Sequence, residues 1–413
     1  MAVQDQLLVL GNGFDLQCGL KSAFADFMKP REALIKQIHE SPESNKIPRY
    51  INLKGPDGRP LDRNLLSSLL WYKRLTVWDF ILAQGKQERP WYDIEACIKT
   101  WVDYGTAGVD SSCAEHMRKI YSHRGETIED FQQPLIAEQS VYLYAQELYQ
   151  VSPMEWNQES ILRILMAELN RFEAEFATYL VGQTENNSEY LQRSGQLLSM
   201  LIFDLLNWVI KPKPPHSNTY DFESVSILNF NYTDPTPLPG NGTPLIQNVH
   251  GRAQTKNIIF GIDGKNLNPN QLHYASTVKF SKTYRLMALR DEPSHSLVRP
   301  YIAGSPDGAT KVIKFFGHSL SDADYSYFQA IFDEVNLYES NTRLIFYYNQ
   351  NRPDGTNAQE EMHEKINRLI TTYGATLDND HHGRNLLHKL LLEGRLIIRQ
   401  PVARTTSNSE ESP

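Results

Sequence analysis

The chain has 413 residues, of which 40% are hydrophobic and 22% are charged, the composition of a globular protein of about two domains. Its formal net charge of −8 and its lack of a Lys/Arg-rich block disfavour a nonspecific electrostatic attraction to nucleic acid or to an anionic membrane, although a local basic patch stays open. Three scattered cysteines are too few for a disulfide framework or a four-cysteine zinc site, so we expect a reducing, cytoplasmic location. We expect no signal peptide, because no basic n-region precedes the first apolar run, and no transmembrane helix, because polar residues interrupt the longest apolar stretch, Leu197 to Ile210.

The first apolar run, Leu7 to Leu10, leads into the turn Gly11-Asn12-Gly13 and then into a helical pattern from Phe14. This order is typical of a phosphate-binding crossover, because glycine lets the backbone adopt φ > 0 and approach an anion closely. Leu16 stands where the dehydrogenase fingerprint GxGxxG requires glycine, so that motif is incomplete. We expect a nucleotide at this turn, with a purely structural β-to-α turn as the alternative.

A long α-helical region follows the turn. Residues 22–40 have helical spacing, with a break predicted at Pro30. The helical pattern then extends over residues 65–210. Apolar residues at spacings of three and four predict one long amphipathic helix from Ile161 to Leu180 and a second helix after it. The proline-rich segment 211–218 marks the end of this region.

The second half of the chain changes to short apolar runs separated by helical segments. The runs predict strands at 224–230, 245–249, 257–260, 312–316, 344–348 and 396–398, and the helical segments lie at about 322–338, 357–374 and 384–393. This alternation favours a parallel sheet with crossover helices. The predicted fold class is therefore α/β.

Both ends of the chain contribute to the predicted core. We expect a discontinuous core of residues 1–30 and 216–404, because the first strand belongs with the later ones. Residues 31–215 then form a large α-helical insertion, and the polar residues 405–413 form a disordered tail.

Three polar stretches directly follow predicted strands. They are N-F-N-Y-T-D at 229–234, N-V-H-G at 248–251 and F-G-H-S-L-S-D-A-D at 316–324. Ligands of parallel sheets bind outside the carboxyl ends of the strands, where these stretches would emerge. We therefore expect them to converge with the glycine turn.

The glycine turn and these stretches, in this order, resemble the nucleotide-binding core of the sirtuins and, more closely, the AbiH family of bacterial phage-defence proteins. The segments similar to that family are G-N-G-F-D at 11–15, W-Y-D-I-E at 91–95, L-N-F-N-Y-T at 228–233, N-V-H-G and F-G-H-S-L-S-D-A-D, and they extend over most of the chain. The resemblance implies a sirtuin-like Rossmann core that binds NAD. By relation to NAD-cleaving, sirtuin-like defence proteins, it implies an antiphage NAD glycohydrolase that releases nicotinamide and ADP-ribose.

The resemblance also implies roles for individual residues. Asn231 stands at the asparagine that orients the reacting ribose and a water, and His250 stands at the catalytic histidine. The implied cofactor-binding residues are Gly11, Asn12, Gly13, Phe14, Asp15, Tyr232, Gly317, His318, Ser319 and Asp322. NAD is the substrate in this hypothesis, and no metal is expected. Neither nucleic acid nor a membrane is expected as a partner, while a homo-oligomer and a phage-derived trigger or partner protein stay open.

The chain departs from the sirtuin pattern at three points. Thr233 occupies the aspartate position of the asparagine loop, with the carboxylate one residue later at Asp234, and Asp15 replaces a serine. The four-cysteine zinc module is absent from the sequence, which disfavours protein deacylation. Cleavage of NAD expels a neutral nicotinamide from a cationic ring, so it needs an oriented ribose and a placed water more than a strong acid. A histidine that accepts a proton contributes typically about 10²- to 10⁴-fold.

Two other functions stay open at this stage. One is a non-catalytic module that binds NAD or ADP-ribose as a signal, and the other is a nucleotide phosphohydrolase that uses Asp15 and Asp234 with a divalent metal. Without the resemblance, Asn231 would be interpreted as a turn cap and His250 as a structural histidine at a strand end.

Several other polar residues have a structural interpretation. Asp93 and Glu95 are two positions apart, which places them on different faces of a helix, so a charge role at the helix N-terminus competes with catalysis. His318 is interpreted as a turn residue and not as a base. The adjacent His381 and His382 cannot readily face one metal ion together, which favours solvent exposure.

Overall fold

The computed structural model describes residues 5–39, 75–88, 94–107, 149, 158–204, 225–235, 243–262, 264, 267–270, 274–289, 296–305, 308–321, 324–349, 357–377 and 382–401. The chain folds as two compact units. The first unit takes in Met1–Lys21, Gln183–Val249 and Glu292–Pro413, and the second takes in Ser22–Gly182 and His250–Asp291. This division differs from the sequence-based one in three places, because residues 183–215 fall in the first unit and residues 22–30 and 250–291 fall in the second.

A six-stranded, all-parallel sheet forms the centre of the first unit, with the order β3-β2-β1-β4-β5-β6. The strands are β1 (Gln6–Leu10), β2 (Val225–Asn229), β3 (Leu245–Asn248), β4 (Val312–Phe316), β5 (Arg343–Tyr347) and β6 (Leu396–Arg399). These positions confirm six of the seven predicted strands and the parallel α/β class. They were predictable because strands covered on both faces have nearly continuous apolar sequences.

The seventh predicted strand is wrong, because residues 257–260 form an irregular segment of the second unit. Ile258, Ile259 and Phe260 are buried, which explains the apolar run. The main chain of Phe260 pairs with side chains, since its N–H donates to Glu173 Oε1 at 2.6 Å and its carbonyl accepts from Arg285 at 2.7 Å. These side chains meet the hydrogen-bonding needs that a neighbouring strand would otherwise meet.

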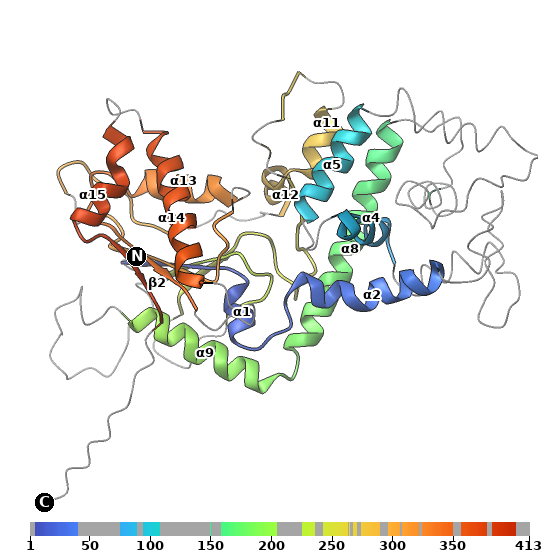
Figure 1. The fold of residues 1–413 in the computed structure, drawn as a ribbon, viewed down its shortest axis with the longest axis horizontal. Helices are drawn as coiled ribbons and strands as arrows, with labels where there is room; N and C mark the ends of the chain where they lie inside the picture. Colours follow the sequence, from blue (N-terminus) through green and yellow to red (C-terminus); the bar gives the residue numbers. More distant parts are fainter. Residues whose placement is uncertain are drawn as a thin grey trace, which may run out of the picture. The chain divides into compact units, whose positions relative to one another are not determined.

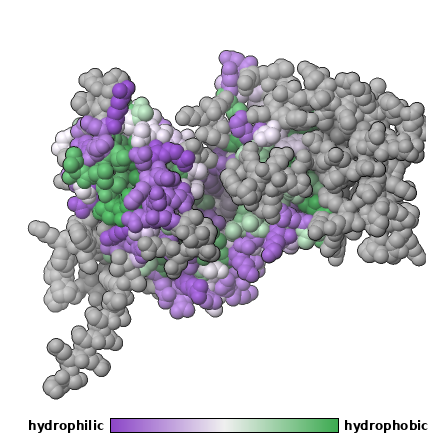
Figure 2. Space-filling model, viewed as in Figure 1, coloured by the Kyte–Doolittle hydropathy of each residue, from purple (hydrophilic) through white to green (hydrophobic). Residues whose placement is uncertain are grey.

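Helices cover both faces of the sheet (Figure 1). On one face lie α13 (Tyr325–Glu334), α14 (Ala358–Gly374) and α15 (Leu386–Leu392), and on the other lie α1 (Gly13–Gln17) and α9 (Ser188–Phe203). Alternate residues of β1 point to opposite faces of the sheet. Leu7 is part of the hydrophobic core on the side of α13, and Leu8 is part of the hydrophobic core on the side of α9. The outward surface of α14 is mostly hydrophilic (Figure 2), as expected for an amphipathic crossover helix.

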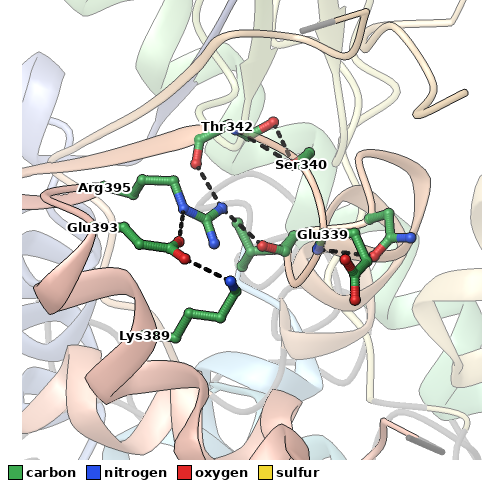
Figure 3. Close-up of polar contacts among 8 residues, drawn as sticks. Glu339, Ser340, Thr342, Lys389, Glu393 and Arg395 are labelled. Carbon is green, nitrogen blue, oxygen red and sulfur yellow. Dashed lines mark hydrogen bonds and ion pairs between the residues drawn. The ribbon is translucent and has the colours of Figure 1, made fainter. Parts of the chain in front are cut away.

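Arg395 fixes the turn from α15 into β6 (Figure 3). Gly394 ends the helix with φ 62°, a conformation that glycine adopts without a Cβ clash. The Arg395 guanidinium donates from Nε to Glu393 Oε2 at 2.7 Å and from Nη1 to the carbonyls of Leu337 at 2.9 Å and Thr342 at 3.2 Å. One buried side chain thereby connects the end of α15 to the segment that enters β5.

The described part of the second unit is mainly α-helical. Its elements are α2 (Phe24–His39), α4 (Val77–Glu88), α5 (Ile94–Ala107), α8 (Gln158–Thr184, whose last two residues belong to the first unit), α11 (Tyr274–Thr277), the 3₁₀ segment η4 (Val278–Phe280) and α12 (Lys282–Leu289). The break predicted at Pro30 is wrong, because Pro30 lies inside the continuous helix α2. Proline removes one helical hydrogen bond, but buried residues before it, Phe27 and Met28, and after it, Ile35, hold the helix by hydrophobic packing.

Candidate functional site

The loops that follow β1 and β4 contact each other through glycine backbones. A Cβ atom on Gly13 would lie 2.6 Å from Gly317 Cα, and one on Gly11 would lie 2.5 Å from His318 Cα. Of these glycines only Gly317 has a positive φ, 69°. The positive φ that we expected in the turn Gly11-Asn12-Gly13 is therefore found in the loop after β4 instead. These glycines are required because two main-chain segments pass within van der Waals contact at the carboxyl ends of the two central strands.

The main-chain N–H groups of the glycine turn bond to the protein itself. Gly11 donates to the Phe316 carbonyl at 3.0 Å, Gly13 to the Gly317 carbonyl at 2.9 Å and Phe14 to the Gly11 carbonyl at 2.9 Å. Helix α1, which follows the turn, has five residues. A phosphate at this turn would therefore have to replace these bonds or bind through other groups.

Asp15 is a buried carboxylate that accepts hydrogen bonds from two distant segments. Tyr190 in α9 donates its hydroxyl to Oδ1 at 2.9 Å, and Thr233 in the loop after β2 donates its hydroxyl to Oδ2 at 2.5 Å. Burial raises the pKa of Asp15 to about 6, although the hydrogen bonds from Thr233 and Tyr190 oppose the rise. The side chain is 2% exposed, so a ligand outside the protein has little access to it.

A network of asparagines shapes the loop after β2. Asn229 donates from Nδ2 to the Thr233 carbonyl at 2.7 Å and accepts at Oδ1 from the Asn231 N–H at 3.1 Å. Asn248, at the end of β3, accepts at Oδ1 from Asn229 Nδ2 at 3.3 Å and donates from Nδ2 to Asp234 at 2.7 Å. These bonds curl residues 229–234 over the carboxyl ends of β2 and β3.

Asn231 differs from its neighbours in this loop. It is 4% exposed, and its Oδ1 atom is buried with no hydrogen-bond partner among the described residues. An unpaired buried acceptor costs about 1 to 3 kcal/mol, so such groups in native proteins generally meet a ligand or an ordered water. The loop therefore presents an amide oxygen that a donor from outside the chain can satisfy.

His318 has a structural environment, as its interpretation as a turn residue predicts. Its Nδ1 accepts from the Leu320 N–H at 2.9 Å, and its Nε2 lies 3.5 Å from Asp324 Oδ2. The ring packs edge-on against Phe230, with centroids 4.3 Å apart. Leu320 has φ 55°, a costly conformation for a branched residue, so the turn after β4 is held under strain by these contacts.

His250 belongs to the second unit and is 7% exposed. Its carbonyl accepts from the Ile259 N–H at 2.9 Å. The next residue, Gly251, has φ 84°, and a Cβ atom there would lie 2.1 Å from the Asn257 carbonyl oxygen. The His-Gly pair is thus part of a tight turn in which only glycine fits.

The other residues assigned from the sequence have different environments. Phe14 is fully buried in the hydrophobic core and packs edge-on against Phe316, so its position is structural. Asn12 and Ser319 are exposed and Tyr232 is half-buried. Asp322 lies outside the described residues.

Two pairs considered for other roles are also placed. Glu95 forms an ion pair with the buried Lys282 at 2.5 Å, within the second unit, whereas Asp93 lies outside the described residues. His382 begins the 3₁₀ segment η6 (His382–Asn385) of the first unit, and His381 lies outside the described residues. Among the described residues no cluster of three or more His, Cys, Asp or Glu side chains could hold a metal ion.

Tyr190 is the polar residue of this region that sequence reasoning missed. It lies 175 positions from Asp15, inside an ordinary amphipathic helical pattern, and no local signal marks it. Asn229 and Asn248 were within the polar stretches, but their role in shaping the loop depends on the pairing of β2 with β3.

The fold and these loops define an α/β protein with a parallel sheet and a polar region at the carboxyl ends of its central strands. The chain matches the family model described as "Bacteriophage abortive infection AbiH" over residues 7–348, and it belongs to this family. The protein is therefore assigned to phage defence by abortive infection. No curated protein and no solved structure matches the chain. Within the described residues, no helix is both long and apolar enough to cross a membrane.

Proposed function

We propose that this protein is an enzyme of phage defence that hydrolyses NAD to nicotinamide and ADP-ribose. The observation that carries the proposal is the buried Oδ1 of Asn231, just past the carboxyl end of β2, which has no hydrogen-bond partner among the residues that the structure describes. A ribose hydroxyl is a donor of the kind that this oxygen lacks. The amide would hold the ribose beside the bond that breaks, and water would supply the hydroxyl that the sugar gains.

The topology of the sheet supports a nucleotide as the ligand. The order β3-β2-β1-β4-β5-β6 is that of doubly wound dinucleotide-binding sheets, whose ligands lie where the strand order reverses, here between β1 and β4. β2, which carries the Asn231 loop, is the neighbour of β1. Phosphate recognition by the N–H groups of Gly11, Gly13 and Phe14 is not part of the proposal, because those groups are already bonded.

The chemistry requires orientation more than acid strength. Nicotinamide leaves as a neutral molecule while positive charge develops on the ribose, and one water adds to the sugar with loss of one proton. Asn231 is the orienting residue in this scheme. His250 stays the candidate, from the family resemblance, for the residue that accepts the proton.

Incubation of the purified chain with NAD, followed by chromatography of free nicotinamide and ADP-ribose, tests the proposal. We expect equimolar release of both products, in the presence of extract from phage-infected cells if the resting protein is silent. Bound but intact NAD would instead identify a binding module. Release of inorganic phosphate that depends on Mg²⁺ would identify a phosphohydrolase.

Asn231→Ala and Asn229→Ala form a matched pair of amide deletions in one loop. Asn231→Ala should abolish nicotinamide release without lowering the thermal midpoint, because the oxygen that it removes has no hydrogen-bond partner in the described part of the chain. Asn229→Ala should lower the midpoint, because it removes bonds to Thr233 and Asn231. Full turnover by a folded Asn231→Ala protein would overturn the proposal.

His250→Ala provides a second test. We expect loss of nicotinamide release in a protein that stays folded, because the change removes a proton acceptor and leaves the tight turn at Gly251 in place. Wild-type turnover in this variant would remove His250 from the catalytic scheme while leaving Asn231 in it.

A further inference from the structure

The carboxylate of Asp15 joins three segments that are far apart in the sequence. It lies in α1, it binds Tyr190 of α9 at 2.9 Å, and it binds Thr233 of the loop after β2 at 2.5 Å. Both donors are neutral hydroxyl groups. Within the described residues, this carboxylate therefore accepts its hydrogen bonds from neutral donors and forms no ion pair.

Thr233 is held on two sides. Its hydroxyl donates to Asp15, and its carbonyl accepts from Asn229 Nδ2 at 2.7 Å. Asn231 is two residues earlier, and its N–H donates to Asn229 Oδ1. The loop is consequently anchored on both sides of the Asn231 side chain, while the carboxamide oxygen is left without a partner in the described residues.

The cost of this arrangement indicates that it has a purpose beyond stability. A buried carboxylate without a cationic partner is expensive to keep ionised, and here burial raises its pKa to about 6. An apolar side chain would fill the same place at less cost. A carboxylate, however, accepts two hydrogen bonds at once and can orient two donors from different segments.

We propose that Asp15 is a positioning residue, which acts through Thr233 to hold the Asn231 carboxamide in the orientation that the reacting ribose requires. This inference rests on the proposed function. It replaces the direct nucleotide contact that the family resemblance implied for Asp15, because the side chain is buried and both its oxygens are engaged.

Substitutions at Thr233 separate orientation from folding. Thr233→Val removes the hydroxyl at constant shape, and Thr233→Ser keeps it. We expect Thr233→Val to lower kcat for nicotinamide release by about tenfold to a hundredfold with little change in KM, since a small misplacement of a reacting group costs about that much. Thr233→Ser should restore most of the loss. A raised KM with unchanged kcat, or an equal loss in both variants, would overturn the proposal.

Thr342→Val is the matched control in the same unit. Thr342 also has a buried hydroxyl, which donates to the Thr310 carbonyl at 2.7 Å, but it lies at the amino end of β5, whereas Thr233 follows the carboxyl end of β2. Thr342→Val and Thr233→Val should lower the thermal midpoint by similar amounts. Only Thr233→Val should lower kcat, and a parallel loss in the control would mean that kcat simply follows stability.

The pH dependence gives a readout that a purely structural role would not change. Protonation of Asp15 adds a donor where the loop needs an acceptor, so kcat should fall as pH drops through about 6. The titratable groups that interact with Asp15 stay neutral there, because burial raises the pKa of Cys18 to about 12 and also raises that of Tyr190. The Arg193 guanidinium interacts with the Cys18 thiol. Thr233→Val should weaken this acidic fall in kcat, because Asp15 then no longer acts on the loop through the Thr233 hydroxyl. An acidic fall as large as that of the parent would contradict the role of Asp15.

Hydrogen exchange separates this inference from the proposed function. In Asp15→Asn and Thr233→Val, amides of residues 229–235 should exchange faster than in the parent, while those of α14 should be unchanged. Unchanged exchange in 229–235 would overturn the positioning role, whatever the activity. If the loop loosens as expected but the parent never releases nicotinamide, the proposed function fails and the anchoring of the loop stands.

Discussion

Lys314, in the central strand β4, donates from Nζ to the main-chain carbonyl of Ile202 at 3.0 Å, at the end of α9. A second bond goes to the Leu201 carbonyl. The last carbonyls of a helix have no partner within the helix, so this buried ammonium caps α9 from inside the sheet. Together with the Tyr190–Asp15 bond, it attaches both ends of α9 to the core that carries the site.

Burial lowers the pKa of Lys314 to about 7, with Asp204 opposing the shift and Arg399 adding to it. The pKa of the unfolded chain is near 10.5, so between these values the unfolded chain binds more protons and the free energy of unfolding rises with pH. Lys314→Met removes this rise in the free energy of unfolding, which is roughly 1.4 kcal/mol per pH unit at most. The thermal midpoint of the variant should therefore fall further behind the parent at pH 8.5 than at pH 6.5.

Lys311→Met is the control for this prediction. Lys311 directly precedes β4, but its side chain is 42% exposed. Its substitution should change the midpoint equally at both pH values. Parallel pH profiles for the parent and Lys314→Met would show that Lys314 stays charged in the folded protein.

Gly13→Ala should destabilise the protein whether or not NAD is present. The new methyl group would lie 2.6 Å from Gly317 Cα, and that contact is between main chains that cannot move apart cheaply. Gly317→Ala should cost at least as much, because it adds the strain of φ 69°. Gly182→Ala is the control, since nothing lies within 4 Å of its Cβ position in α8 and alanine is the better helix former.

The measurements are thermal melts with and without NAD, with calorimetric titration of the folded variants. If Gly13→Ala melts like the parent but binds NAD poorly, the glycine serves the nucleotide and not the contact between loops. A drop in the thermal midpoint of a few degrees or more in both conditions is the expected result.

The strands were predictable from the sequence because a parallel sheet covered on both faces makes each strand a nearly continuous apolar run. The run from Leu7 to Leu10 is of this kind. The run at 257–260 is also apolar, yet the main chain of Phe260 bonds to the side chains of Glu173 and Arg285, which no local pattern reveals. Composition indicated burial in both cases, while the source of the hydrogen bonds decided the structure.

The candidate site also has a part that the sequence predicted and a part that it did not. The polar stretches after β1, β2 and β4 were identified by their position at strand ends, and the structure brings these three together. Their internal roles were not predictable. The glycines meet another loop, and Asp15 meets Tyr190, because both contacts join segments more than 170 positions apart in the chain.

Arg395→Met should destabilise the first unit more than Glu393→Gln does. The guanidinium satisfies the carbonyls of Leu337 and Thr342, and each buried acceptor left unpaired costs about 1 to 3 kcal/mol (Figure 3). Glu393 is half-exposed, so its ion pairs contribute little in water. Urea unfolding should order the proteins as parent, Glu393→Gln and Arg395→Met, from most to least stable.

A pH series tests the same turn. Burial alone would raise the pKa of Glu393, but hydrogen bonds from Lys389 and Arg395 outweigh it and lower the pKa. A lowered carboxyl pKa gives stability that is present above the unfolded value and lost as pH falls through the folded value. The difference between the parent and Glu393→Gln should therefore shrink below about pH 4.5. A difference that persists into stronger acid would assign the effect to packing.

The ion pair between Arg31 and Asp79 allows a test of how buried charge is balanced in the second unit. The Asp79 side chain is fully buried; it pairs with the guanidinium and accepts the Thr76 N–H at 2.6 Å, which caps α4. Asp79→Ala should cost about 3 to 5 kcal/mol, because it removes the carboxylate that the buried Arg31 guanidinium binds. Asp79→Asn keeps an acceptor for Thr76 but removes the negative charge that faces the guanidinium. Adding Arg31→Met to Asp79→Asn should consequently recover part of the lost stability.

Thermal melts of Asp79→Asn, Arg31→Met and the double variant, with hydrogen exchange of α2 and α4 as the local readout, measure this coupling. Simple addition of the two single losses would show that the charge on Arg31 is not what makes Asp79 necessary.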